Sequence, residues 1–334
     1  MPLVTEPVRC PPIASGTWLG GAPVQLSAGR LVLVDFWDYT CVNCLNTLPY
    51  LRAWRERYGG PAFEIVGVHA PEFGFAREPG RVERAMRDLG ITWPVAIDND
   101  YQIWSAYAVR AWPTEFLVDG RGYLRYEHTG EGAYADTEAA IRSLLIERDP
   151  ALTLPPPLPP LRERDAPGAV CRRPTPELYL GWRRGRFGLR DEELGRGERW
   201  VYHAPPAGGR ALHHAYLDGA WTLHDEAAEA ATTGATLSVQ FEAAEVNAVL
   251  APPEDGRAVF AVELDGAPLP PPCWGSDMAT DGETGAPVVT VTQSRMYRLI
   301  AGNAFIAGEL TLRAATPGGS TYALSFIGCV EAHG

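Results

Sequence analysis

The sequence contains no lysine. All 29 of its basic residues are arginine, against 41 acidic residues. This absence excludes chemistry that needs a lysine amine, such as Schiff-base formation. The formal net charge of −12 is spread over the whole chain. No cluster of basic charge is therefore available for a nucleic acid or an anionic membrane surface, and we expect neither as a partner.

Long apolar runs and a secretory leader are also lacking. The chain has no run of about 18 apolar residues that could cross a membrane as a helix. Residues 1–18 contain prolines and a single arginine but no apolar core of the kind found in a signal peptide. By default these features predict a soluble, cytoplasmic protein.

Cysteine is scarce, with six residues in 334, too few for a disulfide framework. Two of them, Cys41 and Cys44, form a Cys-x-x-Cys pair. The other four are isolated from one another in sequence: Cys10, Cys171, Cys273 and Cys329. A zinc site would need a second pair of ligands, so we expect no metal. Cys273 and Cys329 could pair within the C-terminal half, and Cys10 is interpreted as a bystander thiol.

The cysteine pair lies where a predicted strand turns into a helix. Residues 31–37, Leu-Val-Leu-Val-Asp-Phe-Trp, are typical of a short strand that is buried on both faces. The helix that follows ends at Gly59-Gly60, and Thr40 is the predicted N-cap. Cys41 would then lie at the positive end of the helix dipole, which lowers a thiol pKa into the range of roughly 3.5–7.5. This context predicts a redox dithiol, in which Cys41 attacks a disulfide and Cys44 resolves the mixed intermediate.

The pattern of predicted elements changes once along the chain. Up to residue 149, strands alternate with helices, which indicates a mixed sheet with helices on both faces. Nine of the 30 prolines fall between residues 150 and 176, so this segment is predicted to be a stiff, extended linker. Residues 177–334 show roughly six to eight short alternating runs separated by turn signals, which favours an all-β sandwich. The predicted domains are therefore 1–149 and 177–334.

The residues around the cysteine pair resemble the signature of the thioredoxin superfamily. Asp35-Phe-Trp-x-x-x-Cys41-x-x-Cys44, followed by Pro49, matches it at every spacing. The resemblance implies that Asp35 is buried beneath Cys44 and takes its proton; the alternative is a core aspartate satisfied by the backbone. It also implies that Pro113 is a cis-proline whose backbone neighbours grip the substrate chain.

A closer resemblance, to the soluble C-terminal region of DipZ-type thiol–disulfide carriers, covers nearly the whole chain. It rests on Asp-Tyr-Thr-Cys-Val-Asn-Cys at 38–44, on 68–73, on 96–101 and on Thr-Pro-Glu-Leu-Tyr-Leu-Gly at 175–181. A predicted hairpin at 16–27 resembles the TlpA-like redoxins of cytochrome c maturation. The resemblance implies a carbohydrate-binding-module-like sandwich and an extracytoplasmic location. DipZ-type proteins carry a membrane-embedded electron-relay domain ahead of this region, and the resemblance implies such a domain as a partner. This sequence starts without it.

Further candidates surround the dithiol, and others lie in the second domain. Those near the dithiol are Trp37, Tyr39, Thr40, His69, Glu72, Trp112 and Glu115. Glu115 is expected to face solvent or the site, where it could set the protonation of the dithiol; an ordinary edge-facing glutamate fits equally well. His69 is interpreted as a satisfied loop histidine rather than a proton shuttle. Three tryptophans could stack on sugar rings, although core packing explains at least two of them: Trp182, Trp221 and Trp274.

The leading hypothesis is a thiol–disulfide oxidoreductase that acts on protein thiols through Cys41 and Cys44. It needs no bound cofactor, and its sandwich domain docks a protein or binds a carbohydrate. One alternative is a redoxin-type thiol peroxidase. The usual motif of that class, Pro-x-x-x-Thr-x-x-Cys, is not matched, because Thr40 is adjacent to Cys41. Another alternative is a glycan- or protein-binding module that carries a purely structural redoxin.

Overall fold

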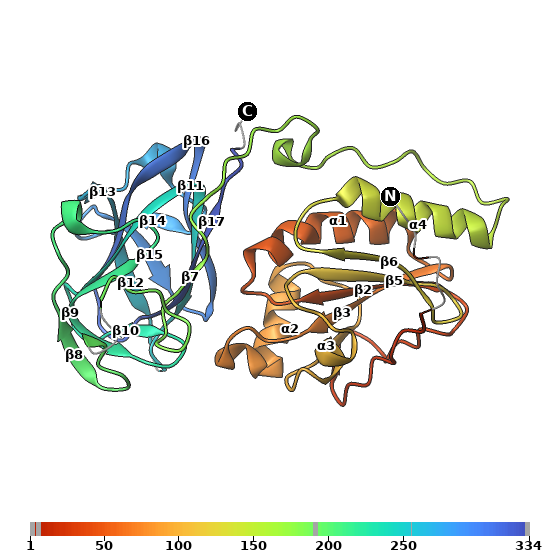
Figure 1. Ribbon diagram of the computed structural model, residues 1–334, viewed down its shortest axis with the longest axis horizontal. Helices are drawn as coiled ribbons and strands as arrows, with labels where there is room; N and C mark the ends of the chain where they lie inside the picture. The colour runs from red at the N-terminus through yellow and green to blue at the C-terminus, as the bar shows by residue number, and fades with distance from the viewer. Residues whose placement is uncertain (1–3, 5–7, 190–192, 255, 331–334) are drawn as a thin grey trace. The chain divides into compact units, whose positions relative to one another are not determined.

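The chain divides into two compact units, residues 1–161 and 162–334 (Figure 1). The computed structural model describes residues 4, 8–189, 193–254 and 256–330. Most of the first seven residues therefore lie outside the described residues. They are part of residues 1–18, the segment predicted to contain no secretory leader. Within the described ranges, no helix is both long enough and apolar enough to span a membrane.

The first unit is built on a mixed sheet of six strands in the order β1-β4-β3-β2-β5-β6, counted over the described residues. Its elements, in chain order, are β1 (Trp18–Leu19), β2 (Leu31–Trp37), α1 (Val42–Tyr58), β3 (Phe63–His69), α2 (Pro79–Asp88), β4 (Val95–Ile97), α3 (Gln102–Ala106), β5 (Thr114–Val118), β6 (Leu124–Thr129) and α4 (Tyr134–Arg148). β2 runs parallel to β3 and antiparallel to β5. The predicted alternation of strands and helices is thus confirmed.

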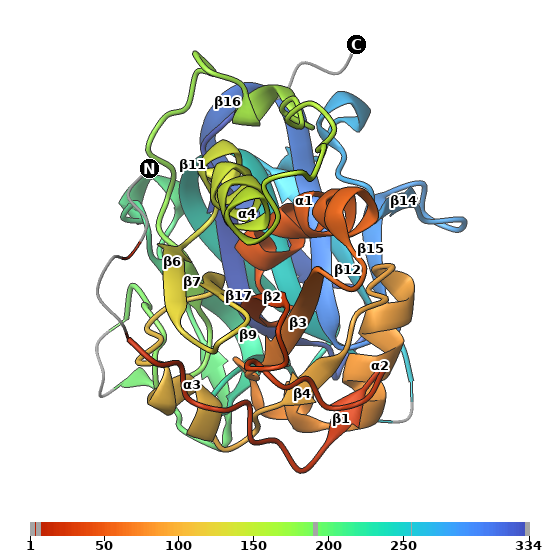
Figure 2. The ribbon, with the colours of Figure 1, turned by 90° about the vertical axis from the view of Figure 1, so that its right-hand side faces the viewer.

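Helices cover both faces of this sheet, which explains why every residue of β2 is buried. α1 and α4 lie on one face and α3 on the other (Figure 1), and Figure 2 shows α1 and α4 side by side. Because side chains alternate along a strand, Leu31 and Leu33 pack with α1 and α4, whereas Val32 and Val34 pack with α3. The same alternation directs Asp35 towards α1, the helix that carries the cysteines.

Two segments differ from the expected structure. The predicted hairpin at 16–27 is wrong, because β1 pairs with β4 rather than with a neighbouring strand. Residues 150–161 of the predicted linker belong to the first unit and contact its helices. The Leu158 amide donates to the carboxylate of Glu138 in α4, and the Leu161 amide donates to the hydroxyl of Tyr50 in α1 at 2.8 Å.

The second unit is all β, as predicted, and its described strands form one antiparallel sheet of eleven strands. They are β7 (Leu178–Tyr179), β8 (Arg199–Tyr202), β9 (Ala215–Leu223), β10 (Ala228–Ala230), β11 (Thr236–Ala251), β12 (Ala258–Leu264), β13 (Ala267–Pro268), β14 (Met278–Thr280), β15 (Pro287–Val291), β16 (Arg295–Ala314) and β17 (Ser320–Ile327). Two of the short alternating runs, at 237–241 and 246–250, lie in one continuous strand, β11. β11 continues through irregularities near Ala243 that the apolar pattern alone does not reveal.

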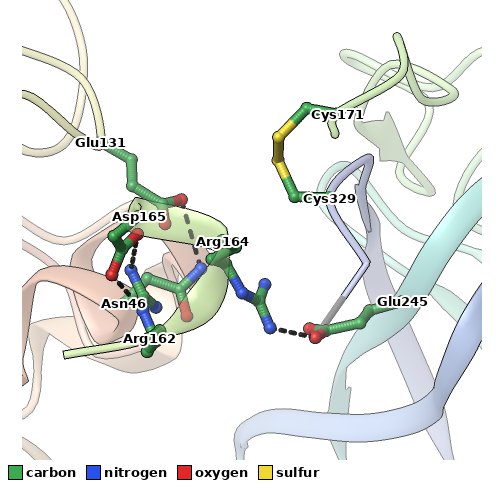
Figure 3. Close-up of a disulfide and its surroundings, with 8 residues drawn as sticks. All are labelled: Asn46, Glu131, Arg162, Arg164, Asp165, Cys171, Glu245 and Cys329. Carbon is green, nitrogen blue, oxygen red and sulfur yellow. Dashed lines mark hydrogen bonds and ion pairs between the residues drawn. A yellow bond between two sulfur atoms is a disulfide. The ribbon is translucent and has the colours of Figure 1, made fainter. Parts of the chain in front are cut away.

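A disulfide joins Cys171 to Cys329, so the suggested pairing of Cys273 with Cys329 is wrong (Figure 3). It connects the segment before β7 to the second residue after β17. In the same unit, Arg164 forms an ion pair with Glu245 of β11, and the two side chains are only 5% and 9% exposed. Both contacts hold residues 162–172 against the sheet of their own unit.

Cys171→Ser is expected to destabilise the second unit by roughly 2–5 kcal/mol, because the disulfide closes a long loop in the unfolded chain. The two cysteines are 158 residues apart. Urea denaturation followed by tryptophan fluorescence measures the change, and Cys273→Ser is the matched control because this thiol is free. An unchanged denaturation midpoint in Cys171→Ser would contradict a stabilising role for the disulfide.

Candidate active site at the Cys41–Cys44 dithiol

Cys41 itself is the N-cap of α1, so the prediction that Thr40 fills this position is wrong. The backbone amide of Cys44 donates a hydrogen bond to Cys41 Sγ at 3.3 Å. The sulfur therefore lies directly on the free amides of the first helical turn. A negatively charged sulfur is favoured at this end of the helix dipole, which makes Cys41 the natural nucleophile of the pair.

Thr40 instead belongs to a turn held by Asp38, which is completely buried. Asp38 Oδ1 accepts hydrogen bonds from the Thr40 amide at 2.6 Å and the Thr40 hydroxyl at 2.5 Å, and Oδ2 accepts one from the Glu72 amide at 2.8 Å. Burial raises the pKa of Asp38, while these hydrogen bonds lower it. Asp38 thus fixes the turn before Cys41 against the segment after β3. Sequence reasoning did not select Asp38, although an Asp-x-Thr turn beside the dithiol is a recognisable signal.

The two thiols differ in exposure and in environment. Cys41 is half-buried and Cys44 is only 2% exposed. Burial raises the pKa of the Cys44 thiol well above its usual range, and the neighbouring Cys41 and Asp35 raise it further. Cys44 is therefore held protonated behind Cys41. This asymmetry provides one accessible attacking sulfur and one protected sulfur that must lose a proton before it reacts.

A buried pair of carboxyl groups lies behind Cys44. Asp35 and Glu115 are direct cross-strand partners in β2 and β5, and each is 2% exposed. Burial raises the pKa of Asp35 well above its usual range, and the charge of Glu115 adds to this shift. Burial also raises the pKa of Glu115 to about 7. At least one of the two groups is therefore readily protonated near neutral pH.

The surroundings of this pair distinguish between the alternatives left open for Glu115 and for Asp35. Glu115 does not face solvent and does not lie on an edge strand, because β5 lies between β2 and β6. Its Oε2 accepts a hydrogen bond from Thr137 of α4 at 3.1 Å. Within the part of the chain that the structure describes, Asp35 Oδ1 and Glu115 Oε1 have no hydrogen-bond partner. Asp35 is therefore not an aspartate fully satisfied by the backbone.

His69 is the last residue of β3 and is completely buried, so its interpretation as a loop histidine is wrong. Its ring stacks on Tyr39 with centroids 5.7 Å apart and meets the edge of Trp37 at 5.4 Å. Burial lowers the pKa of His69 to about 3. The ring is therefore neutral, and its approach to Asp38 at 3.5 Å is not an ion pair. His69 packs against the aromatic side chains that precede Cys41.

The loop that carries Pro113 is tied to the same segments. The Trp112–Pro113 peptide bond is cis. Trp112 Nε1 donates to the carbonyl of Ala70 at 3.1 Å, and the Pro113 carbonyl accepts from the Gly130 amide at 2.8 Å. The turn before Cys41 and the Pro113 loop therefore both bond to residues 70–72. Apart from Trp112 and Pro113, the predicted site residues contact one another, Asp38 or Cys44 through hydrogen bonds, ring contacts and buried charges.

The tryptophans of the second unit that could stack on sugar rings differ in how deeply they are buried. Trp221 is fully buried, and Trp274 packs on the core and donates to the Leu269 carbonyl at 2.8 Å. Trp182 is 38% exposed, and Trp200, which sequence reasoning missed, is 50% exposed. In the described ranges, no group of three or more His, Cys, Asp or Glu side chains is arranged to hold a metal ion.

A buried strand that leads into a helix-capping dithiol, with a buried aspartate beneath it, defines the first unit as a thioredoxin-like domain. Comparison with known families agrees. Residues 9–144 match the Redoxin family, and residues 175–326 match the family described as "Thioredoxin like C-terminal domain". The chain therefore consists of a redoxin domain of the thioredoxin superfamily followed by this C-terminal domain.

Individual known proteins are similar to this chain over different shares of its length. The chain is 33% identical over 267 residues to the protein DipZ of Mycobacterium tuberculosis, a match that covers 77% of this chain and 36% of DipZ. It thus spans about a third of that relative. It is also 25% identical to the thiol-disulfide oxidoreductase YkuV of Bacillus subtilis, over 40% of this chain and 90% of YkuV. A solved thioredoxin-like protein in its oxidised form is 24% identical with a TM-score of 0.39, covering 42% of this chain and 97% of that one.

Proposed function

We propose that the protein is a thiol–disulfide oxidoreductase that exchanges electrons with protein thiols through Cys41 and Cys44. One observation carries the proposal: a half-exposed sulfur caps a helix, and a second, buried sulfur lies on the first turn of the same helix. The dithiol carries the two electrons itself, so the reaction needs no bound cofactor.

The reductive reaction has two steps. The Cys41 thiolate attacks one sulfur of a substrate disulfide, forms a mixed disulfide and releases the other substrate sulfur as a thiolate, which takes up a proton. Cys44 then loses its proton to the carboxyl pair at Asp35 and attacks Cys41 Sγ. The Cys41–Cys44 disulfide forms, the bond to the substrate breaks, and the second substrate thiol leaves. Two electrons pass from the protein to the substrate, and oxidation of a dithiol substrate is the reverse.

The loop at Trp112–Pro113 is the proposed contact for the extended substrate chain, because it is bonded to the segment that supports the cysteine turn. We further propose that a separate thiol carrier, such as a membrane-bound electron relay, restores the dithiol. The second unit would dock that carrier or a carbohydrate. Trp182 and Trp200 are its candidate contact residues, since both are more than a third exposed.

Cys41→Ser is expected to abolish catalysis of insulin disulfide reduction by dithiothreitol, because Cys44 is too buried to replace the missing nucleophile. The turbidity of the released insulin chain measures the rate. Cys10→Ser is the matched control and should retain the wild-type rate. Full activity in Cys41→Ser would overturn the proposal. Peroxide consumption without insulin reduction in the wild type would instead favour a thiol peroxidase.

A further inference from the structure

Three titratable side chains form a row across the sheet behind the dithiol. Asp35 of β2 pairs in register with Glu115 of β5, and Glu115 pairs in register with His128 of β6. Figure 1 shows these three strands as neighbours, with β6 at the edge of the sheet. Directly opposed residues on adjacent antiparallel strands point to the same face, with their Cβ atoms roughly 4.5–5.5 Å apart. The row therefore runs from the buried thiol to the edge of the sheet.

We propose that Asp35, Glu115 and His128 form a proton relay that connects the Cys44 thiol with solvent. The inference rests on the proposed function and deepens it. It assigns the exit of the proton to the edge strand β6 and not to the mouth of the dithiol, which the substrate covers during resolution. His128 would be the exchange point with water, and Glu115 would be the link between the two ends.

The unpaired atoms along the row support this assignment. Asp35 Oδ1, Glu115 Oε1 and His128 Nε2 are all buried, and none has a hydrogen-bond partner within the described residues. Buried polar atoms without partners are costly, so three of them in one row call for an explanation. A proton that moves along the row would be bound by each atom in turn.

His128 has a buried ring nitrogen in a residue that is partly exposed as a whole. The residue is half-buried, although its Nε2 has almost no exposed surface. Burial lowers the pKa of His128, while a hydrogen bond with the Gly130 backbone and the charge of Asp136 in α4 raise it. The ring therefore stays largely neutral and can accept a proton from inside and release it outside.

Other side chains orient or influence the row. From α4, Thr137 donates to Glu115 Oε2 at 3.1 Å, and its hydroxyl lies 3.2 Å from the Tyr126 hydroxyl of β6. Thr137 is thus a positioning residue that keeps Oε1 free. From α1, Cys44 is the group that interacts with Asp35. Its deprotonation and the protonation of the carboxyl pair are therefore coupled events.

In the resolution step one S–H bond breaks and one disulfide bond is exchanged for another. The S–H bond of Cys44 breaks and its proton passes to the Asp35–Glu115 pair, which releases a proton to His128 and then to water. The Cys44 thiolate attacks Cys41 Sγ, forms the Cys41–Cys44 bond and expels the substrate thiolate. The two electrons needed to cleave the substrate disulfide come from the dithiol, so no further reductant takes part.

A reaction with an aromatic disulfide such as dithiobis(nitrobenzoate) separates the two steps. In a Cys10→Ser, Cys273→Ser background, the first release of coloured thiolate reports attack by Cys41. The second, unimolecular release reports resolution by Cys44. Glu115→Gln and His128→Ala are expected to slow the second phase roughly 10- to 100-fold, at or below the lower limit of about 100-fold for a proton donor or acceptor that contacts the reacting group, because both residues act through Asp35. The first phase should remain at the wild-type rate.

Imidazole in the buffer distinguishes a relay from a structural role. It is expected to restore the second phase of His128→Ala in a saturable manner and to leave Glu115→Gln slow. His203→Ala, an exposed histidine of the second unit, is the matched control and should have no effect in either phase. Second phases at the wild-type rate in both relay variants would overturn the relay alone. A wild-type protein that releases no thiolate would overturn the proposed function.

Discussion

Cys44→Ser is expected to end turnover and to trap the substrate on Cys41. The variant retains the helix-capping, half-buried sulfur of Cys41, so the first attack proceeds as in the wild type. It lacks the Cys44 thiol, which is fixed beside Cys41 in the wild type and displaces the substrate. Release of the substrate from the variant therefore requires a thiol from solution. Turnover should therefore fall by roughly two orders of magnitude or more. Non-reducing electrophoresis with a disulfide-bonded protein substrate would show the trapped adduct as a band that disappears with excess dithiothreitol.

The double variant Cys41→Ser, Cys44→Ser is the control for this experiment. Because Cys10, Cys273 and the Cys171–Cys329 disulfide remain in it, any adduct that it forms reports those cysteines instead of the dithiol. A trapped adduct in Cys44→Ser but not in the double variant agrees with Cys41 as the nucleophile. Equal adduct in both variants would mean that another cysteine attacks the substrate.

Asp35→Asn is expected to slow resolution by roughly 100-fold and, at the same time, to stabilise the fold at neutral pH. The first effect follows from loss of the nearest proton acceptor for Cys44. The second follows because burial and Glu115 raise the pKa of Asp35, so its ionised form is costly inside the protein. Rapid-quench measurement of the mixed disulfide gives the rate, and urea denaturation gives the stability.

The Asp35–Glu115 pair makes the free energy of unfolding depend on pH. The pKa values of Asp35 and Glu115 are higher in the folded state than in the unfolded state. Between the unfolded and folded pKa values, the folded state therefore binds more protons than the unfolded state. Stability is therefore lost as pH rises, for Glu115 between about 4.5 and about 7. Asp35→Asn removes one of the two groups and should lose less stability than the wild type as pH rises from about 4.5 to about 7. A steeper loss in the variant would contradict this description of the carboxyl pair.

His69 contributes in the opposite direction. Its folded pKa of about 3 lies below the unfolded value, so its contribution is lost as pH falls from about 6.5 towards about 3. This contribution is present in both the wild type and Asp35→Asn. The difference between the two proteins therefore isolates the carboxyl pair.

Much of the first unit could be predicted from residues 31–49. An unbroken apolar run, a polar turn and a helix with two cysteines at its start specify β2, α1 and the approximate place of the dithiol. The alternation of side chains along β2 also directs Asp35 towards the cysteines. These features are local in sequence, so a short stretch contains all the information needed to predict them.

The parts that could not be predicted depend on pairing between distant segments. From sequence alone, Glu115 could face solvent, the site or an edge. Its register with Asp35, which brings it beside the buried aspartate, depends on the pairing of β2 with β5. The partner of Cys329 depends on which segment lies beside the end of β17. The N-cap is an exception: Thr40 met the local rules for this position, yet its hydroxyl donates to the buried carboxylate of Asp38, only two residues away. In each case a long-range or buried contact overrode a reasonable local preference.

Mapping of the disulfides after mild oxidation tests the central claim most directly. The protein would be equilibrated with oxidised and reduced glutathione, alkylated, digested and analysed by mass spectrometry. We predict a Cys41–Cys44 disulfide whose fraction follows the glutathione ratio, while Cys171–Cys329 stays oxidised and Cys10 and Cys273 stay alkylated. A Cys41 that remains a thiol at every ratio, or that pairs with a cysteine other than Cys44, would contradict a redox dithiol at the start of α1.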